Sequence, residues 1–293
     1  ALRGHDAVIL EAKPKPAGLN EYGIAAYKVP DAFAQREVAF LLAIGGIEIR
    51  NGQALGRDFS LDDLRRDYDA VFLGMGLGGV RALGLEGEDM EGVYNAVDYI
   101  AALRQAPDLK VLPVGRRVVV IGGGNTAIDI AVQTRRLGAE EVTLVYRRGP
   151  EALSATHHEQ DFAQTCGVTI RHWAQPKALE GEGGQLTGVT FEYTRLENDR
   201  LAGTGETFTL KADMLFKAIG QTMNPLPKTN GSSELPEMQG ERIAVGPDRR
   251  SSLPDVWAGG DCVSISEDLT VAAVQDGKLA AEAIDAWLRG GAG

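Results

Sequence analysis

The sequence is poor in cysteine and in positive charge, and it has no long apolar run. Its two cysteines, Cys166 and Cys262, form no Cys-x-x-Cys pair, which excludes a disulfide scaffold or a cysteine-ligated metal site within the chain. The 30 Lys and Arg against 41 Asp and Glu give a net charge of −11. That balance argues against nucleic acid and anionic membrane surfaces as partners. No run approaches the ~18 apolar residues of a membrane-spanning helix, and a reducing, cytoplasmic setting fits.

Glycine, in contrast, is abundant. The chain has 37 glycines in 293 residues, roughly twice the usual ~7% share, and no collagen period. This excess indicates many tight turns and close backbone approaches. The hydrophobic fraction of 44% is ordinary for a globular protein with a sizeable core, and the length predicts roughly two domains.

The first strand of the chain ends in an acidic residue. Residues 7–10 form a run of four apolar residues that reads as a buried strand, and Glu11 follows it. An acid in this place is typical of βαβ units that bind the ribose of an adenine dinucleotide. We therefore expect the preceding strand and its glycine turn to lie before Ala1, and the chain to begin near the end of a crossover helix.

Buried strands and helices alternate along the rest of the chain. We expect strands over 70–73, 117–121, 142–146 and 256–258, helices over 125–137 and 270–288, and a strand-rich stretch over 168–219. Ser60-x-x-Asp63 resembles a capping box that starts a short helix. The alternation predicts an α/β fold with parallel sheets.

The motif with the clearest chemistry is Gly122-x-Gly124-x-x-Ala127, which follows a strand and opens a helix. In that context it is a dinucleotide fingerprint. The first glycine makes the turn, the second lets a pyrophosphate approach the backbone, and the third position lets the helix pack against the strand. The helix N-terminus adds free N–H groups and a positive dipole end. The alternative is a glycine turn that only connects the strand to the helix.

Two arginines end the next strand. Arg147 and Arg148 begin 23 residues beyond Gly124, where an acid would accept the ribose 2′-hydroxyl of NAD. Arginine instead suits the 2′-phosphate of NADP. NADP(H) is therefore favoured over NAD(H), with a solvated basic turn as the alternative.

A second turn, Gly259-Gly260-Asp261, follows the strand at 256–258. A carboxylate there can accept a hydrogen bond from a flavin ribityl hydroxyl. The helix that opens near Thr270 can direct its dipole at the flavin pyrimidine edge. Alone, Gly-Gly-Asp is only a turn; together with Glu11 and the fingerprint it favours a flavin site.

Other reactive side chains indicate no chemistry. His157, His158 and Glu159 are adjacent, and adjacent side chains on a helix do not converge on a metal. We interpret both cysteines as packing residues, and the lack of a Cys-x-x-Cys pair argues against a disulfide-reductase mechanism. We therefore assign no catalytic side chain and no metal ligand.

Six segments spread over nearly the whole chain match one family. They are Gly18-Leu19-x-x-x-Gly23-Ile24-x-x-x-Lys28, the strand and turn over 70–76, Val120-Ile121-Gly122-Gly123-Gly124-Asn125-Thr126-Ala127-x-Asp129, Tyr146-Arg147-Arg148, Ala218-Ile219-Gly220-Gln221 and Gly259-Gly260-Asp261-Cys262. Together they resemble the flavin- and NAD(P)-binding module shared by glutamate synthase small subunits and dihydropyrimidine dehydrogenases. Residues 19–24 and 268–271 look closer to the flavin subunit of bacterial dihydropyrimidine dehydrogenase.

The resemblance implies two Rossmann-like domains. A NAD(P) domain over 108–221 would be inserted into an FAD domain split between 1–107 and 222–293. Glu11 would hold the FAD ribose, and Gly18 and Leu19 would lie along the flavin. Further cofactor-binding residues implied by the matching motifs are Lys28, Gly74, Gly76, Gly122, Gly124, Asn125, Thr126, Arg147, Arg148, Gly220, Gly260, Asp261 and Thr270.

Members of this family take a hydride from NAD(P)H to FAD and pass electrons through iron–sulfur clusters to a partner. The resemblance thus implies the electron-input subunit of a dihydropyrimidine dehydrogenase-type complex, working with its large catalytic subunit. Hydride transfer would follow from positioning alone. A glutamate synthase small subunit with its own large subunit is the alternative, and a non-catalytic nucleotide-binding scaffold is the alternative of another class.

Three departures from the family pattern matter. The cysteine-rich N-terminal domain is not in the sequence, so iron–sulfur clusters would belong to a missing N-terminal region or to the partner. The first glycine turn, for the FAD pyrophosphate, is also missing, so we expect this chain alone to bind FAD weakly or not at all. Residues 153–158 read Leu-Ser-Ala-Thr-His-His where many relatives read Met-Pro-Gly-Ser-Arg-Arg.

Overall fold

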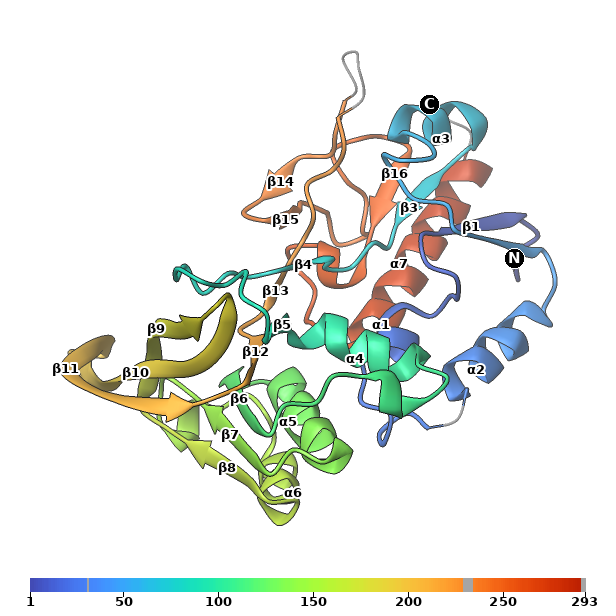
Figure 1. The fold of residues 1–293 in the computed structure, drawn as a ribbon. Helices are drawn as coiled ribbons and strands as arrows, with labels where there is room; N and C mark the ends of the chain where they lie inside the picture. Colours follow the sequence, from blue (N-terminus) through green and yellow to red (C-terminus); the bar gives the residue numbers. More distant parts are fainter. Residues whose placement is uncertain (31, 229–233, 291–293) are drawn as a thin grey trace. The chain divides into compact units, whose positions relative to one another are not determined.

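The computed structural model describes residues 1–30, 32–228 and 234–290 (Figure 1). Cα packing divides the chain into two compact units. The first comprises Ala1–Pro16, Gln35–Gly79 and Gln221–Gly293, and the second comprises Ala17–Ala34 and Val80–Gly220. The second unit takes in residues 17–34 and 80–107, which the division drawn from the sequence groups with the first domain. Which unit holds which cofactor stays a prediction.

The second unit is built on a five-stranded parallel sheet. Its strand order is β5-β12-β6-β7-β8 (Figure 1). The strands are β5 (Val93–Asn95), β6 (Arg117–Gly122), β7 (Glu141–Val145), β8 (Val168–Arg171) and β12 (Met214–Ala218). The helices and 3-10 turns of this unit are α1 (Gly18–Tyr22), α4 (Ala96–Gln105), η1 (Leu109–Val111), α5 (Asn125–Leu137), η2 (Pro150–Ala152) and α6 (His157–Thr165).

The central strand β6 is buried on both faces, which explains its unbroken apolar sequence. Val118 and Val120 pack in a core with Ile100 of α4 and Ile128 of α5. The alternate residues Val119 and Ile121 pack in a second core with side chains of an antiparallel sheet. The parallel sheet is therefore the middle of three layers, and the α/β fold class is confirmed.

The antiparallel sheet has strand order β11-β10-β9 and runs between β8 and β12 in the sequence. Its strands are β9 (Ala174–Glu182), β10 (Gln185–Glu197) and β11 (Arg200–Lys211). Strand β9 lies within the strand-rich stretch expected over 168–219, although only Ala174 in it is buried and Pro176 interrupts its pattern. A proline is tolerated here because β9 is an edge strand.

The described residues of the first unit form short two-stranded sheets. The parallel pairs are β1 (Ala7–Glu11) with β2 (Ile47–Asn51) and β3 (Val71–Leu73) with β16 (Val256–Ala258), and the antiparallel pair is β14 (Met238–Gln239) with β15 (Arg242–Ile243). The helical elements are α2 (Phe33–Leu42), α3 (Leu61–Asp67), η3 (Gly260–Cys262) and α7 (Thr270–Arg289). Strands β4 (Gly79–Val80) and β13 (Gln221–Thr222) lie where the chain passes between units.

The predicted helix ends are largely confirmed. Ser60 and Asp63 form the expected capping box at the start of α3. Gly138 ends α5 with a φ of 115°, the left-handed conformation that favours glycine at this position. Among the described residues, no helix is both long enough and apolar enough to cross a bilayer.

Candidate dinucleotide-binding site

The predicted nucleotide residues of the second unit lie at one edge of its parallel sheet. In the ladder, Gly122 of β6 is level with Ala218 of β12, and Ile121 is level with Val145 of β7. The carboxyl ends of these three strands therefore lie side by side, and ligands of open α/β sheets bind at this edge. The turns that follow the strands carry Gly220, the fingerprint residues Gly122, Gly124, Asn125 and Thr126, and the pair Arg147 and Arg148.

The glycines of the fingerprint turn differ in what surrounds them. A Cβ on Gly122 would lie 2.3 Å from the carbonyl oxygen of Ala218, and one on Gly123 would lie 2.5 Å from the ring of Tyr146. The chain itself therefore requires glycine at both positions. A Cβ on Gly124 would meet only the Ser154 hydroxyl, at 3.4 Å, and its φ of −96° suits any residue. Apart from the Ser154 hydroxyl and the two chain neighbours of Gly124, no described residue comes within 4 Å of a Cβ at Gly124, so the space beside this glycine is open.

Helix α5 begins directly beyond this space. Its N-cap is Gly124, and no side chain caps it among the described residues. The first N–H groups of a helix have no intrahelical partner. The N–H groups of Asn125 and Thr126 therefore lie at the positive end of the helix dipole and remain available to an anion. Ala127 is completely buried, as the third position of the fingerprint requires. The arrangement fits a bound pyrophosphate.

In the arginine pair after β7, the backbone carbonyls accept hydrogen bonds from neighbouring residues, whereas the side chains extend into solvent. The hydroxyl of Thr194 donates to the carbonyl of Arg147 at 2.7 Å, and the N–H of Trp173 donates to that of Arg148 at 3.2 Å. Both arginine side chains are exposed. Neither guanidinium makes a hydrogen bond or ion pair with any described residue, which leaves both free for a phosphate.

In the first unit, the turn after β16 lies beside the turn after β3. The N–H of Gly259 donates to the carbonyl of Leu73 at 3.2 Å, which brings Gly74 and Gly76 to the same edge as Gly260 and Asp261. The N–H of Gly260 is already taken: it donates to Asp276 of α7 at 2.8 Å. This turn therefore offers fewer free backbone donors than the fingerprint turn.

Asp261 is the reactive feature of that turn. Its carboxylate is half-buried and makes no hydrogen bond within the described part of the chain. Burial, and secondly Asp268, raise its pKa, while Arg242 opposes the shift. A desolvated acceptor without a donor fits a ligand hydroxyl. Thr270 begins α7 and is exposed, with no side-chain cap at that helix end.

The early cofactor residues fall in both units. Glu11 ends β1 in the first unit, and its carboxylate accepts the N–H of Lys13 at 2.8 Å. Gly18 and Leu19 open α1 in the second unit, where Leu19 is 44% exposed. Lys28 is ion-paired with Asp129 at 2.7 Å and with Glu159.

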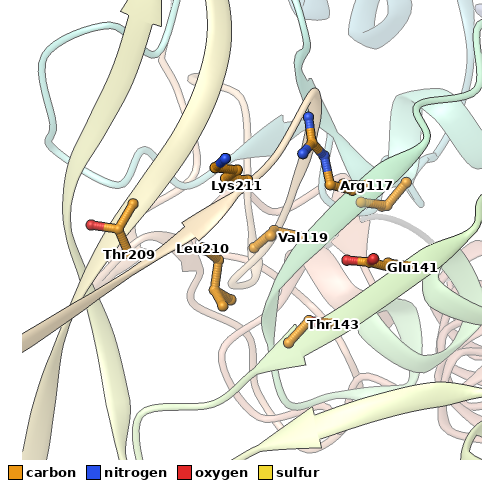
Figure 2. Close-up of a pocket in the computed structure, with 8 residues that line it drawn as sticks. Arg117, Val119, Glu141, Thr143, Thr209, Leu210 and Lys211 are labelled. Carbon is orange, nitrogen blue, oxygen red and sulfur yellow. The ribbon is translucent and has the colours of Figure 1, made fainter.

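One cavity, of about 290 Å³, lies elsewhere on the second unit (Figure 2). Arg117 and Glu141, the first residues of β6 and β7, line it together with Lys211 of β11. It therefore opens at the amino ends of the strands, opposite the edge that carries the fingerprint. The strand-end rule excludes it as the dinucleotide site.

Two residues near the fingerprint were not assigned a role from the sequence. Ser154 donates its hydroxyl to the carbonyl of Gly123 at 3.3 Å, and nothing in the sequence indicated that contact. Asp129 is 4% exposed between the buried residues Ile128 and Ile130. A charged residue within a buried stretch of helix indicates that it pairs with a polar or charged group elsewhere in the fold. No group of three or more His, Cys, Asp or Glu in the described ranges could hold a metal ion.

Comparison with known proteins gives the family. The pyridine nucleotide-disulphide oxidoreductase family matches residues 6–277. The chain belongs to this oxidoreductase family. It has no Cys-x-x-Cys pair, and its two cysteines lie in different units.

Two curated relatives are similar along nearly the whole chain. The glutamate synthase [NADPH] small chain of Escherichia coli is 34% identical, over 97% of this chain and 64% of its own length. The NADP(+)-dependent formate dehydrogenase subunit beta of Moorella thermoacetica is also 34% identical, over 99% of this chain and 41% of its own length. The chain thus spans between about two-fifths and two-thirds of these relatives.

Two solved structures share the fold. FprA of Mycobacterium tuberculosis in complex with NADPH has a TM-score of 0.77 at 20% identity, over 97% of this chain and 78% of its own. Thioredoxin reductase of T. acidophilum has a TM-score of 0.68 at 20% identity, over 96% of this chain and 97% of its own. The family expected from the sequence is confirmed at the level of glutamate synthase small-chain relatives. The dihydropyrimidine dehydrogenase branch stays a prediction.

Proposed function

We propose that this chain is the electron-input module of a multi-subunit oxidoreductase, binding NADPH and FAD. Its similarity to the glutamate synthase [NADPH] small chain and to a formate dehydrogenase beta subunit supports this class of activity. When both groups are bound, the nicotinamide supplies a hydride and the flavin accepts it. The chain's own residues bind and orient the two groups, and no side chain acts as an acid or a base.

The observation that carries the proposal is the unfilled space at Gly124. Internal packing explains Gly122 and Gly123 but not Gly124, where a side chain would meet only one hydroxyl. A glycine that the fold does not need, directly before an uncapped 13-residue helix, fits close approach of a pyrophosphate. Thr126 and Asn125 would direct their N–H groups at it.

The choice of NADPH follows from Arg147 and Arg148. Their guanidinium groups have no partner among the described residues, and their backbone is held by Thr194 and Trp173. A fixed pair of free arginines suits a 2′-phosphate, since each guanidinium can bind two phosphate oxygens.

The residues proposed to bind FAD are Glu11, Asp261 and Thr270 of the first unit and Gly18 and Leu19 of the second. The unpartnered Asp261 would accept a ribityl hydroxyl, and the N-terminus of α7 at Thr270 would face the pyrimidine edge. Glu11 would accept the ribose hydroxyls, and Gly18 and Leu19 would lie along the flavin. The sequence holds one glycine fingerprint, which serves NADPH.

Electrons would leave through iron–sulfur clusters outside these residues, in a cytoplasmic complex with a large catalytic subunit. Residues 19–24 and 268–271 favour a dihydropyrimidine dehydrogenase-type partner. The glutamate synthase relatives favour that partner instead. Purifying the intact gene product from its own cells and identifying the co-purifying subunit decides between them: a pyrimidine-reducing subunit supports the first, a glutamate synthase large chain the second.

Titration calorimetry tests the nucleotide site directly. The purified chain should bind NADPH at least tenfold more tightly than NADH. The intact gene product should show flavin absorbance that NADPH bleaches under anaerobic conditions. A chain that binds neither nucleotide, or an intact protein without flavin, would overturn the proposal. NADPH binding without any bleaching would favour a non-catalytic scaffold.

A further inference from the structure

Residues 17–34 form a segment that leaves one unit to pack on the other. Their neighbours on both sides, Ala1–Pro16 and Gln35–Gly79, belong to the first unit, but the segment itself belongs to the second. Apart from the five-residue helix α1 and the start of α2, the described residues of this segment, 17–30 and 32–34, have irregular backbone. Buried irregular backbone needs hydrogen-bond partners, so those partners show what holds the segment.

Helix α5 provides acceptors for the segment's N–H groups. The N–H of Ala25 donates to Oδ2 of Asp129 at 3.4 Å, and the N–H of Ala26 donates to Oε1 of Gln133 at 3.3 Å. Both acceptor side chains are 4% exposed, and Ala25 is completely buried. Two side chains one turn apart on α5 thus bind two successive amides.

Helix α4 provides donors for the segment's carbonyl groups. Nη1 of Arg104 donates to the carbonyls of Ile24 and Val29, each at 3.0 Å, and Nε donates to that of Glu21. The single guanidinium of Arg104 therefore donates hydrogen bonds to three backbone carbonyls of this segment. The segment is held by side chains from both helices.

The side chains of Tyr27 and Lys28 add a partly buried charged contact. The Tyr27 hydroxyl donates to Oδ1 of Asp129 at 2.9 Å, and the Lys28 ammonium lies 2.7 Å from the same oxygen. Lys28 also contacts Glu159 of α6. Burial opposes the charge on Lys28, but the hydrogen bonds to the two carboxylates outweigh it and raise the pKa of Lys28. The ammonium is thus charged at neutral pH.

Asp129 lies on α5, the same helix whose N-terminus forms the proposed nucleotide site. It lies one helical turn after Asn125, the first residue of α5. The segment that it holds begins with Gly18 and Leu19, the residues proposed to lie along the flavin. One carboxylate therefore joins the helix of the nucleotide site to the segment of the flavin site.

We infer that Asp129 is a positioning residue that fixes the flavin-facing segment on the NADPH-binding helix, with Lys28 as its counter-ion. The naming of the two cofactors rests on the proposed function; the attachment of the segment does not. Lys28 then serves Asp129 instead of contacting a cofactor. Removing the charge of Asp129 leaves NADPH binding in place but loosens residues 17–34.

Hydrogen exchange followed by mass spectrometry tests the attachment without any cofactor. In Asp129→Asn and in Lys28→Met, amides in peptides covering residues 20–30 should exchange at least tenfold faster than in the unmodified chain. Peptides from β10 and β11 should be unchanged, which shows that the fold is kept. The matched control is Asp161→Asn, an exposed acid on α6, and Lys28→Arg should restore protection. Unchanged exchange at 20–30 in both variants would overturn the inference.

A second measurement separates positioning from ligand contact. NADPH affinity by calorimetry should stay within threefold in Asp129→Asn, while reduction of flavin in the intact protein slows at least tenfold. Loss of NADPH binding with unchanged exchange would make Asp129 a ligand residue and overturn the inference. If the unmodified chain binds no NADPH, the proposed function fails, and the exchange experiment still decides whether Asp129 holds the segment.

Discussion

The two glycine turns after β6 and after β16 differ in the polar groups that they leave without a hydrogen bond among the described residues. In the first turn, Gly124 lies before an uncapped helix and leaves its space empty. In the second, the N–H of Gly260 is bound by Asp276, and the group without a partner is the carboxylate of Asp261. One turn presents donors and the other presents an acceptor.

The difference shows that two similar strand–turn–helix motifs need not bind similar groups. Free N–H groups and a helix dipole favour an anion such as a pyrophosphate. A half-buried carboxylate repels an anion and favours hydroxyl donors, such as those of a sugar or a ribityl chain.

The largest effect is expected at the first glycine of the β6 turn. Gly122→Val would place a Cβ 2.3 Å from the carbonyl of Ala218, at a φ of 152°. We expect the free energy of unfolding to fall by about 3 kcal/mol, measured by urea denaturation followed by circular dichroism. A variant as stable as the unmodified chain would show that internal packing does not require this glycine.

Next in size is the loss of the two free guanidinium groups. The double change Arg147→Ala and Arg148→Ala should weaken NADPH binding about 30-fold, or about 2 kcal/mol, while NADH binding stays within twofold. Stability should not change, because neither side chain has a partner in the described part of the chain. Titration calorimetry with NADPH and with NADH measures whether the loss of affinity is selective for NADPH. An equal loss for NADPH and NADH would place the pair away from the 2′-phosphate.

The Gly124 space gives the third test, matched to Gly122. Gly124→Ala should weaken NADPH binding about tenfold, or about 1.4 kcal/mol, because the methyl group fills the approach to the helix end. The free energy of unfolding should change by less than about 1 kcal/mol, since the methyl meets only Ser154. Unaltered NADPH affinity in a folded Gly124→Ala protein would contradict a phosphate at this turn.

The β6 turn was predictable because its determinants are local. A strand of four consecutive apolar residues is buried on both faces, and the glycines follow it directly, so the sequence alone indicates strand, turn and helix. The carboxylate of Asp261 was predictable for the same reason. The lack of a hydrogen-bond partner for this carboxylate among the described residues could not be predicted, because it depends on all the side chains that the fold brings near it.

The attachment of residues 17–34 could not be predicted from the sequence. The segment has no hydrophobic period that fixes its place, and its partners Arg104 and Asp129 lie 75 to 104 residues further along the chain. From the sequence, this segment is expected to belong to the same domain as its neighbours in the chain. The structure packs it instead on the unit that provides its hydrogen bonds.

The smallest effect is expected at the β16 turn. Here the same substitution should raise the stability of the chain and weaken its binding of flavin. Because burial raises the pKa of Asp261, the folded chain binds a proton there more readily than the unfolded chain, so ionisation at neutral pH costs stability. Asp261→Asn should therefore raise the stability of the cofactor-free chain at pH 7, by less than about 1 kcal/mol because the group is only half-buried. This gain should vanish as the pH falls below about 3, where the carboxyl group is protonated in both the folded and the unfolded chain.

The same variant should lose flavin in the intact protein, since an amide is a weaker acceptor than a carboxylate. Thermal unfolding of the cofactor-free chain at pH 7 and at about pH 3, with flavin absorbance of the intact protein measured at pH 7, separates the two effects. The matched control is Asp248→Asn, an exposed acid of the same unit, which should change neither. A destabilised Asp261→Asn chain at pH 7 would mean that the carboxylate serves the fold, and that the contrast between the two turns lies in packing rather than in ligand chemistry.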